Sequence, residues 1–226
     1  MRAGKILALI LSVAPMAACD AVAQGSRSVT FDFQKPGAAP AAFACEVTGP
    51  GGPGRWVVTQ ALAEGGIRRV LAQTSQIAAP DRLPHCVLKN YRGADVDAVV
   101  LIRPVSGTRA QAGGIIWRVL DRQNYYALLI DAKSGEMSIL RMERGRAAPL
   151  PIAGEDRKFA HRVRLERDRW YQLRVRAMNA RFEVFLDDAK RFEVEDGALR
   201  GAGAVGLVTL GDSVIQFDAF NVAPAR

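Results

Sequence analysis

The sequence predicts a single all-β domain of the sandwich class. About thirteen short apolar segments follow one another at close spacing, each bounded by turn-forming residues, which is typical of antiparallel sheets. Several segments alternate apolar and polar residues, as strands with one buried face do. No segment carries a sustained apolar stripe at the helical period. With 226 residues, 49% of them hydrophobic and 24% charged, the chain is long enough for one substantial core.

The N-terminal third is predicted to hold short strands separated by loops. Residues 29–33 alternate like a strand, and 36–44 is rich in Pro and Ala, as loops are. The stretch 49–54 reads GPGGPG, which excludes helix and strand because Gly is entropically costly there and Pro lacks an amide donor. Further strands are expected at 56–59, 67–73 and 86–89.

The middle of the chain carries the longest strands. After a strand at 96–103, residues 112–142 form three apolar runs separated by DRQN and AKSG. Each run has strand length and each break has turn chemistry, which predicts a three-stranded antiparallel meander. In the C-terminal part, 170–177 alternates cleanly, which indicates one buried and one solvated face. The remaining strands are expected at 161–167, 181–187, 191–194, 205–210 and 214–222.

The basic charge balance does not by itself indicate a nucleic-acid partner. The chain has 31 basic and 23 acidic side chains, a net charge of +8, and loss of a leader with Arg2 and Lys5 leaves 29 against 23, or +6. The arginines are dispersed beside apolar or acidic neighbours, for example at Arg174 and Arg176. Such dispersion is typical of a solvated sheet face. We therefore expect no nucleic-acid partner.

Residues 1–23 are interpreted as a secretory signal peptide. A short positive segment precedes an apolar run at 6–13, which is too short for a membrane-spanning helix, and small residues follow it. The protein is therefore expected to be exported, to the periplasm or the cell envelope. Residues 24–226 are expected to form one folded domain.

Two cleavage sites stay open for this signal. The sequence MAAC that ends at Cys19 is similar to a bacterial lipobox, although Met16 stands where Leu is usual. Cleavage before Cys19 would leave its thiol lipidated and anchor the chain to a membrane. Alternatively, the AVA sequence that ends at Ala23 fits an ordinary signal-peptidase site, with Gln24 as the first mature residue.

Cys45 and Cys86 are the two cysteines of the expected folded domain. In an exported protein such a pair predicts one disulfide, with two unpaired buried thiols as the alternative. The bond would close a loop of about 40 residues and stabilise the fold by roughly 3–4 kcal/mol in the chain-entropy model. No metal site and no cofactor are expected, because there is no CxxC motif and the histidines are only His85 and His161.

Five stretches carry a family resemblance. They are GGIIWR at 113–118, NYYAL at 124–128, WYQLRV at 170–175, VGLVT at 205–209 and FDAFNV at 217–222. Their order resembles the concanavalin A-like lectin/glucanase superfamily, which implies a jelly-roll β-sandwich of two antiparallel sheets. Within that superfamily the chain is most similar to bacterial 3-keto-disaccharide hydrolase-type and laminin-G-like domains, over about residues 29–223. These are fold motifs, so they imply architecture rather than activity.

The resemblance leaves the activity open. Laminarinase-type glycosidases of that superfamily carry acids at alternating strand positions, as E-x-D-x-x-E or E-x-D-x-E. The nearest stretch, FEVEDG at 192–197, lacks the third acid and runs into a turn, so we interpret it as a solvated strand end. The favoured function is binding of carbohydrate or a cell-envelope glycan. A glycoside or 3-keto-disaccharide hydrolase is the alternative, and a structural envelope protein is a further one.

Strand alternation divides the meander into two faces. With Arg122 and Gln123 at the centre of the first turn, Trp117 is expected to pair with Leu128. The face around Trp117 is apolar and is predicted to be core rather than a sugar platform. The opposite face is mixed, and the superfamily resemblance implies that an open, concave face of this kind binds glycans.

The candidate ligand-binding residues follow from that mixed face. Tyr125 would stack on or hydrogen-bond a sugar, and Arg118 would donate hydrogen bonds to hydroxyls or a carboxylate. Asp131 opposite Glu136 would offer two carboxylates for acid/base work or a cation, unless both merely flank a turn. The full set is Arg103, Arg118, Tyr125, Asp131 and Glu136, and no catalytic residue is assigned.

Overall fold

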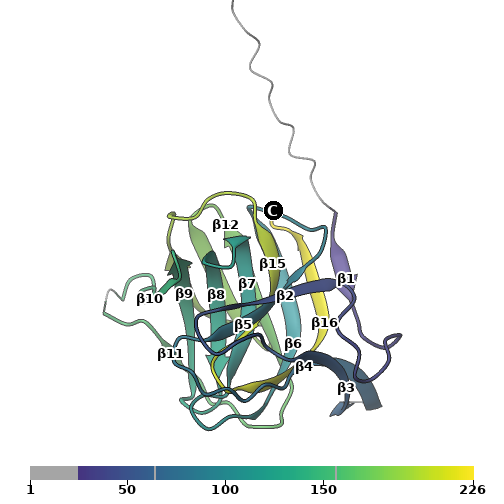
Figure 1. Ribbon diagram of the computed structural model, residues 1–226. Coiled ribbons are helices and arrows are strands. Elements are labelled where there is room, and N and C mark those ends of the chain that lie inside the picture. The colour runs from purple at the N-terminus through teal and green to yellow at the C-terminus, as the bar shows by residue number, and fades with distance from the viewer. Residues whose placement is uncertain (1–24, 64, 156) are drawn as a thin grey trace, which may run out of the picture.

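Two eight-stranded antiparallel sheets pack face to face in a computed structural model that describes residues 25–63, 65–155 and 157–226 (Figure 1). The interpreted signal peptide, with Cys19, lies outside the described residues. Among the residues that the structure describes, no helix is long and apolar enough to span a membrane. The elements of the described residues, β1 to β16, are all strands, as the alternating sequence pattern predicts.

Each sheet is a row of hydrogen-bonded strands with one short strand added beside it. Sheet A consists of β14 (Ala189–Glu195), β13 (Arg181–Leu186), β12 (Tyr171–Met178), β6 (Val96–Ser106), β16 (Val214–Pro224), β4 (Gly66–Gln73) and β3 (Trp56–Ala63), and β1 (Arg27–Val29) pairs with the end of β16. Sheet B consists of β10 (Arg146–Pro149), β9 (Glu136–Glu143), β8 (Asn124–Asp131), β7 (Ala112–Asp121), β15 (Ala204–Thr209), β5 (Leu83–Leu88) and β2 (Phe43–Thr48), and β11 (His161–Arg162) pairs with β9.

The main core lies between the two sheets and is centred on the meander β7–β8–β9. Trp117 is fully buried there, stacked on Tyr126 with ring centroids 5.5 Å apart and in edge contact with Phe182 at 5.2 Å. Burial of each such side chain stabilises the fold by roughly 1.5–3 kcal/mol. The prediction that Trp117 is core is confirmed.

The structure differs from the expected strands mainly at sheet edges. Residues 43–48 form β2, although its Pro- and Ala-rich approach favours a loop, because β5 supplies a hydrogen-bonding partner along its whole length. Likewise 146–149 pairs with β9 as β10. The first strand ends at Val29, and the following residues turn so that Phe31 is buried and Phe33 is exposed. Edge pairing of this kind depends on partners distant in sequence, which local patterns do not record.

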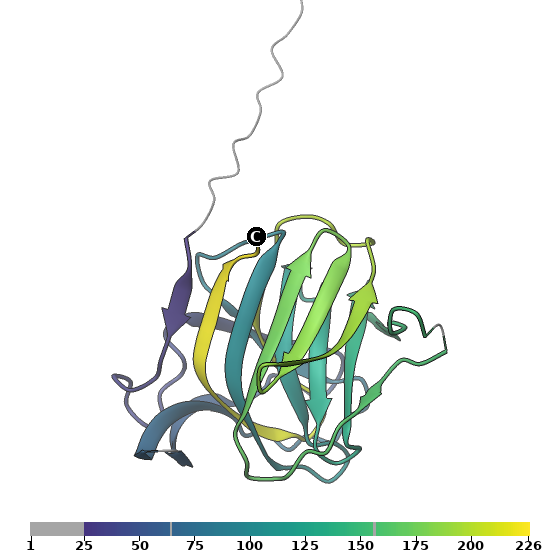
Figure 2. The same ribbon diagram turned by 180° about the vertical axis from the view of Figure 1, so that it is seen from behind.

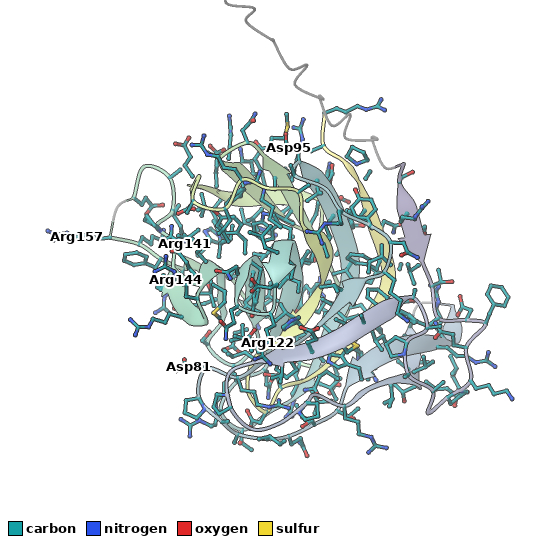
Figure 3. All side chains as sticks on the ribbon, turned by 45° about the horizontal axis from the view of Figure 1, so that its top comes forward. Asp81, Asp95, Arg122, Arg141, Arg144 and Arg157 are labelled. Atoms are coloured by element: carbon teal, nitrogen blue, oxygen red, sulfur yellow. A yellow bond between two sulfur atoms is a disulfide. The ribbon has the colours of Figure 1, made fainter. Side chains whose placement is uncertain are left out.

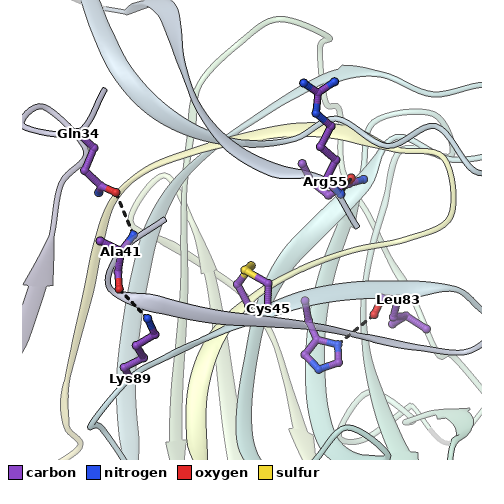
Figure 4. Close-up of a disulfide and its surroundings, with 9 residues drawn as sticks. Gln34, Ala41, Cys45, Arg55, Leu83 and Lys89 are labelled. Atoms are coloured by element: carbon purple, nitrogen blue, oxygen red, sulfur yellow. Dashed lines mark hydrogen bonds between the residues drawn. A yellow bond between two sulfur atoms is a disulfide. The ribbon is translucent and has the colours of Figure 1, made fainter. Parts of the chain in front are cut away.

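The predicted disulfide between Cys45 and Cys86 is confirmed (Figure 4). The two residues are direct cross-strand partners in β2 and β5, so their side chains leave the sheet on the same side. Cys86 is buried in the main core. The bond therefore fixes the edge strand β2 to the body of sheet B.

Candidate functional site

The β7–β8 hairpin has the expected turn and a different register. Asp121 pairs with Asn124, which places Arg122 and Gln123 at the turn centre as predicted, whereas Trp117 pairs with Tyr126 instead of Leu128. Three residues of β7 therefore lie opposite one residue of β8. This bulge inserts two residues, so the residues on either side of it keep the faces that alternation assigns.

Arg118 lies in this bulge, and the expectation that its side chain is on the outer, ligand-binding face is corrected here. Its φ of 49° turns the side chain away from the outer face, and its exposed fraction is 1%. The guanidinium donates to the carbonyls of Ala94 at 2.7 Å and Leu199 at 2.9 Å. It also donates to the Asp95 carboxylate at 3.2 Å and packs over the Phe182 ring. Arg118 thus ties loops together at one end of the sandwich and has no open side for a glycan.

Tyr125 is likewise buried rather than exposed on a binding face. Thr48 donates its hydroxyl proton to the Arg122 carbonyl, so the Tyr125 hydroxyl donates to Thr48 Oγ1 at 2.9 Å. The Tyr125 ring also packs on His85 with centroids 5.3 Å apart. Burial raises the pKa of Tyr125 to about 12. The side chain is therefore a neutral structural contact.

These contacts show that the outer face of sheet B is closed over β7 and β8. β2 and β8 lie four strand positions apart, about 19 Å in a flat sheet, yet Thr48 and Tyr125 share a hydrogen bond. The sheet must therefore curl until β5 and β2 reach back over β8, and Figure 1 shows β2 crossing in front of the neighbouring strands. A second apolar cluster fills the enclosed space: Leu83, Ile116, Val119, Tyr125, Ala127, Leu129, Met142, Ala204 and Val208.

The other three expected ligand residues lie elsewhere. Asp131 pairs with Glu136 as predicted, at the β8–β9 turn. The Asp131 carboxylate accepts hydrogen bonds from the backbone N–H of Gln111 and Lys133, both at 2.9 Å, so it caps a turn. Arg103 is on the outer face of sheet A, where it pairs with Asp168 at 3.2 Å. The five residues therefore do not converge on one site, and Arg118 and Tyr125 are not on an open face.

Metal-ligand geometry is also missing from the described part of the chain. No group of three or more His, Cys, Asp or Glu side chains there is placed to hold a metal ion. His85 is buried, and its ring nitrogen Nδ1 lies 3.0 Å from the Leu83 carbonyl. Burial, as the largest cause, lowers the pKa of His85. We treat His85 as a neutral core residue.

An open groove lies instead on the outer face of sheet A. The strands of sheet A are nearest the viewer in Figure 2. It has a volume of about 420 Å³, within the range of roughly 300–1,000 Å³ usual for small-molecule sites. The central strands β6 and β16 contribute the apolar side chains Val99 and Ala223. We call this the sheet-A groove. Its polar lining comes from β1 and the residue before it, from β6, β12 and β16, and from the β13–β14 turn: Ser26, Arg27, Ser28, Asp97, Gln172, Arg174, Asp188 and Asn221.

The charges of the sheet-A groove are largely paired. The Arg174 guanidinium donates two hydrogen bonds to the Asp97 carboxylate and packs over the Phe185 ring at 5.1 Å. This carboxylate is the main reason that the pKa of Arg174 is raised. Gln172 donates to Asp188 at 2.5 Å. Planar polar groups are thereby held in fixed orientations around an apolar base.

Asn221 adds an acceptor to this arrangement. Its Nδ2 donates to the Ala219 carbonyl at 2.8 Å, which fixes the side-chain amide. No described residue donates a hydrogen bond to Asn221 Oδ1, so this oxygen can accept one from a ligand. A groove with oriented carboxylate, amide and guanidinium groups over apolar side chains has the chemistry to bind a neutral polyhydroxylated ligand.

Sequence reasoning missed these groove residues as a site, although a signal was present. Alternation in 170–177 places Gln172 and Arg174 on the solvated face, and Asp97 and Asn221 are polar positions in the mostly apolar strands β6 and β16. The sequence pattern does not show which strands are neighbours in the sheet. β6 joins β12 and β16 in the sheet, and the pairing brings residues from distant parts of the chain to one groove.

Comparisons with known proteins give a fold and no family. No family model matches the chain, and no curated protein matches it. Among solved structures, the carbohydrate binding module CBM66 from Bacillus subtilis is 21% identical with a TM-score of 0.57, and the match covers 74% of this chain and 94% of that one. A protein of unknown function from Shewanella oneidensis is 12% identical with a TM-score of 0.54, over 89% and 87% of the two chains.

A third similar structure was solved with a sugar. Domain 4 of an extracellular GH43 arabinanase from Geobacillus stearothermophilus, in complex with arabinotriose, is 12% identical with a TM-score of 0.51, over 89% of this chain and 94% of that domain. At these identities the likeness is one of fold. The chain has the concanavalin A-like β-sandwich of two antiparallel sheets, and that prediction is confirmed.

Proposed function

We propose that this protein is a carbohydrate-binding domain that holds a neutral saccharide in the sheet-A groove. The observation that carries the proposal is the groove itself, where oriented polar side chains surround Val99 and Ala223. Supporting it, two structures of the same fold are described as a carbohydrate binding module and as an arabinanase domain in complex with arabinotriose.

The proposed site differs from the one expected on sheet B in a way that can be measured. Isothermal titration against arabinotriose and a panel of neutral oligosaccharides identifies the preferred sugar. We expect Asn221→Ala and Gln172→Ala each to weaken its binding about 3- to 10-fold, because each removes one or two neutral hydrogen bonds.

A matched control comes from the other sheet. Ser138→Ala removes a half-buried hydroxyl from the outer side of sheet B and should leave the affinity unchanged. If the groove variants bind as tightly as the wild type, or if Ser138→Ala weakens binding equally, the proposed site is wrong.

Export to the periplasm or envelope is proposed as part of the same function. The support is the signal-like segment 1–23 together with the Cys45–Cys86 disulfide, since disulfides persist mainly in oxidising compartments. Mass spectrometry of the mature N-terminus tests it. A lipidated Cys19 supports a membrane-anchored lipoprotein, a Gln24 start supports a free exported protein, and an intact Met1 contradicts both.

Hydrolysis of a 3-keto-disaccharide or glycoside has weaker support. The family resemblance favours it, whereas the carboxylates first considered for it, Asp131 and Glu136, flank a turn away from the sheet-A groove. Turnover of a 3-keto-disaccharide that is lost in Glu136→Gln would favour the hydrolase. Binding without turnover favours the proposal above.

A further inference from the structure

A second hollow lies on sheet B, whereas the sheet-A groove lies on the other sheet of the sandwich. It has a volume of about 370 Å³ and three walls: the end of β2, the β7–β8 turn and the β9–β10 turn. We call it the arginine cleft. The residues that the argument uses are Thr48, Arg122, Gln123, Arg144 and Gly145.

The three walls are hydrogen-bonded to one another. Gly145 N–H donates to the Gln123 carbonyl at 3.1 Å, and Arg144 N–H donates to Asn124 Oδ1 at 3.0 Å, so the two turns are fixed side by side. Thr48 donates to the Arg122 carbonyl and joins the third wall. The two central residues of the β9–β10 turn, Arg144 and Gly145, both have positive φ, 51° and 76°, as a tight type I′ hairpin turn requires. The cleft is therefore preformed.

The cleft is positively charged, in contrast to the sheet-A groove. Arg122 and Arg144 are exposed and line it, and neither forms an ion pair with another described residue. Arg144 also lines an adjoining hollow of about 570 Å³ along the β9–β10 hairpin, together with Arg141 and Arg146. Figure 3 shows Arg122, Arg141 and Arg144 at neighbouring positions. Arg141 is neutralised by Glu143 and Asp196, and Arg122 interacts electrostatically with the adjacent Asp121. In the described part of the chain, Arg144 and Arg146 have no acidic partner, so the cleft keeps a positive excess.

These features indicate a carboxylate ligand of sugar size. Arginine binds carboxylates through two parallel hydrogen bonds, and its planar fork gives that contact a defined geometry. The Gln123 amide beside them can donate to and accept from hydroxyl groups. None of the described residues that line the cleft is aromatic, so the base stacking on which single-stranded nucleic acids depend is missing. A flat membrane surface does not fit a recess between two turns and the end of β2.

We propose that the arginine cleft binds a uronate, the carboxylate-bearing sugar of an acidic glycan. The inference deepens the proposed glycan-binding function, since it names a second sugar class at a second place. It predicts that acidic and neutral saccharides bind independently, one at each side of the sandwich.

The test is titration with trigalacturonate and with the same trimer as its methyl ester. We expect the acid to bind at least about 10-fold more tightly than the ester, because esterification removes the charge that arginine recognises. Arg122→Gln and Arg144→Asn should each weaken binding of the acid about 10-fold or more. Asn is chosen at 144 because it tolerates positive φ, so the turn is retained.

Matched controls separate this inference from general polyanion binding. Arg109→Gln removes another exposed arginine, in the loop before β7 and so at the far end of that strand, and should leave affinity for the acid unchanged. Thermal unfolding shows whether each variant is folded. The inference is overturned if the ester binds as well as the acid, if both cleft variants keep wild-type affinity, if Arg109→Gln weakens binding equally, or if dextran sulfate binds equally well.

The outcome is independent of the neutral-sugar site. Arg122→Gln should leave neutral-oligosaccharide binding at the sheet-A groove unchanged. If the acidic trimer binds and neutral saccharides do not, the proposal for the sheet-A groove is wrong and that for the arginine cleft is supported. Neutral binding without acid binding would mean the reverse.

Discussion

The outer faces of sheets A and B differ in their residues and in whether they are covered. On sheet A, β12 and β13 place polar residues outward, and Arg174, Arg176 and Glu183 form ion pairs at the surface. On sheet B, β7 and β8 are apolar on both sides, and Ile116 and Leu129 are buried beneath the curled edge strands. A strand that is apolar on both faces is usually covered on both faces. The difference leaves sheet A as the side with room for a neutral ligand.

The largest expected effect tests what holds the sheet-B face closed. Replacing Cys45 and Cys86 together by Ala should lower the free energy of unfolding by roughly 3–4 kcal/mol, because the bond closes a 41-residue separation and retains β2 over the second core. Urea unfolding measures the loss, and the reduced wild type is the matched control. A loss below about 1 kcal/mol would mean that β2 stays closed without the bond.

A pair of core-sized truncations compares the two faces directly. Ile116→Ala on β7 should cost about 3 kcal/mol, since the enclosed cluster cannot collapse fully into the cavity. Leu101→Ala on the half-buried outer side of β6 should cost less than about 1 kcal/mol. The shift in Tm of each variant measures this difference. Equal losses would contradict a closed face on sheet B.

The hydrogen bonds between two loops that connect sheet A to sheet B should stabilise the fold less at low pH. Asp212, in the loop from β15 to β16, accepts hydrogen bonds from the hydroxyl and backbone N–H of Thr108 and from the N–H of Arg109, in the loop from β6 to β7. Desolvation opposes ionisation, but these hydrogen bonds outweigh it and lower the Asp212 pKa from 3.8 to about 2. The contribution is therefore complete above pH 3.8 and is lost as pH falls to about 2. It amounts to roughly 2 kcal/mol.

Comparing Asp212→Asn with the wild type isolates that contribution. The stability difference between the two proteins should shrink as pH falls from about 4 toward 2, as measured by denaturant unfolding across that range. A difference that is constant with pH would show that the Asp212 carboxylate does not carry this effect.

The smallest effect is expected among the surface ion pairs of sheet A. Glu183→Gln weakens contacts with Arg176 and Lys190 and should cost at most about 1 kcal/mol at low salt. At about 1 M salt the Debye length is about 3 Å, so the difference should nearly vanish. Salt-dependent unfolding of the two proteins measures it. A larger, salt-independent loss would mean that Glu183 is effectively buried.

The solvated and apolar patterns of individual strands were determined by sequence alone. Alternation in 170–177 predicts the wet face of sheet A, and the apolar run around Trp117 predicts the main core. The paired Cys45 and Cys86 and the Asp131–Glu136 register also follow from sequence, because each depends on composition or on one short turn. These features are local or are set by a single constraint.

Tertiary structure alone decided which faces are open and which distant residues meet. Curling of sheet B buries Tyr125, and the β7 bulge turns Arg118 inward, so side chains that a regular strand would expose become structural. The first outcome depends on β2 and β5 pairing beside strands far away in sequence, and the second on the carbonyls of Ala94 and Leu199 that accept from Arg118. The sheet-A groove and the arginine cleft arise the same way, from turns and strands that only long-range pairing brings together. A local pattern records which side of a strand is polar, whereas cover and neighbours depend on the whole sheet.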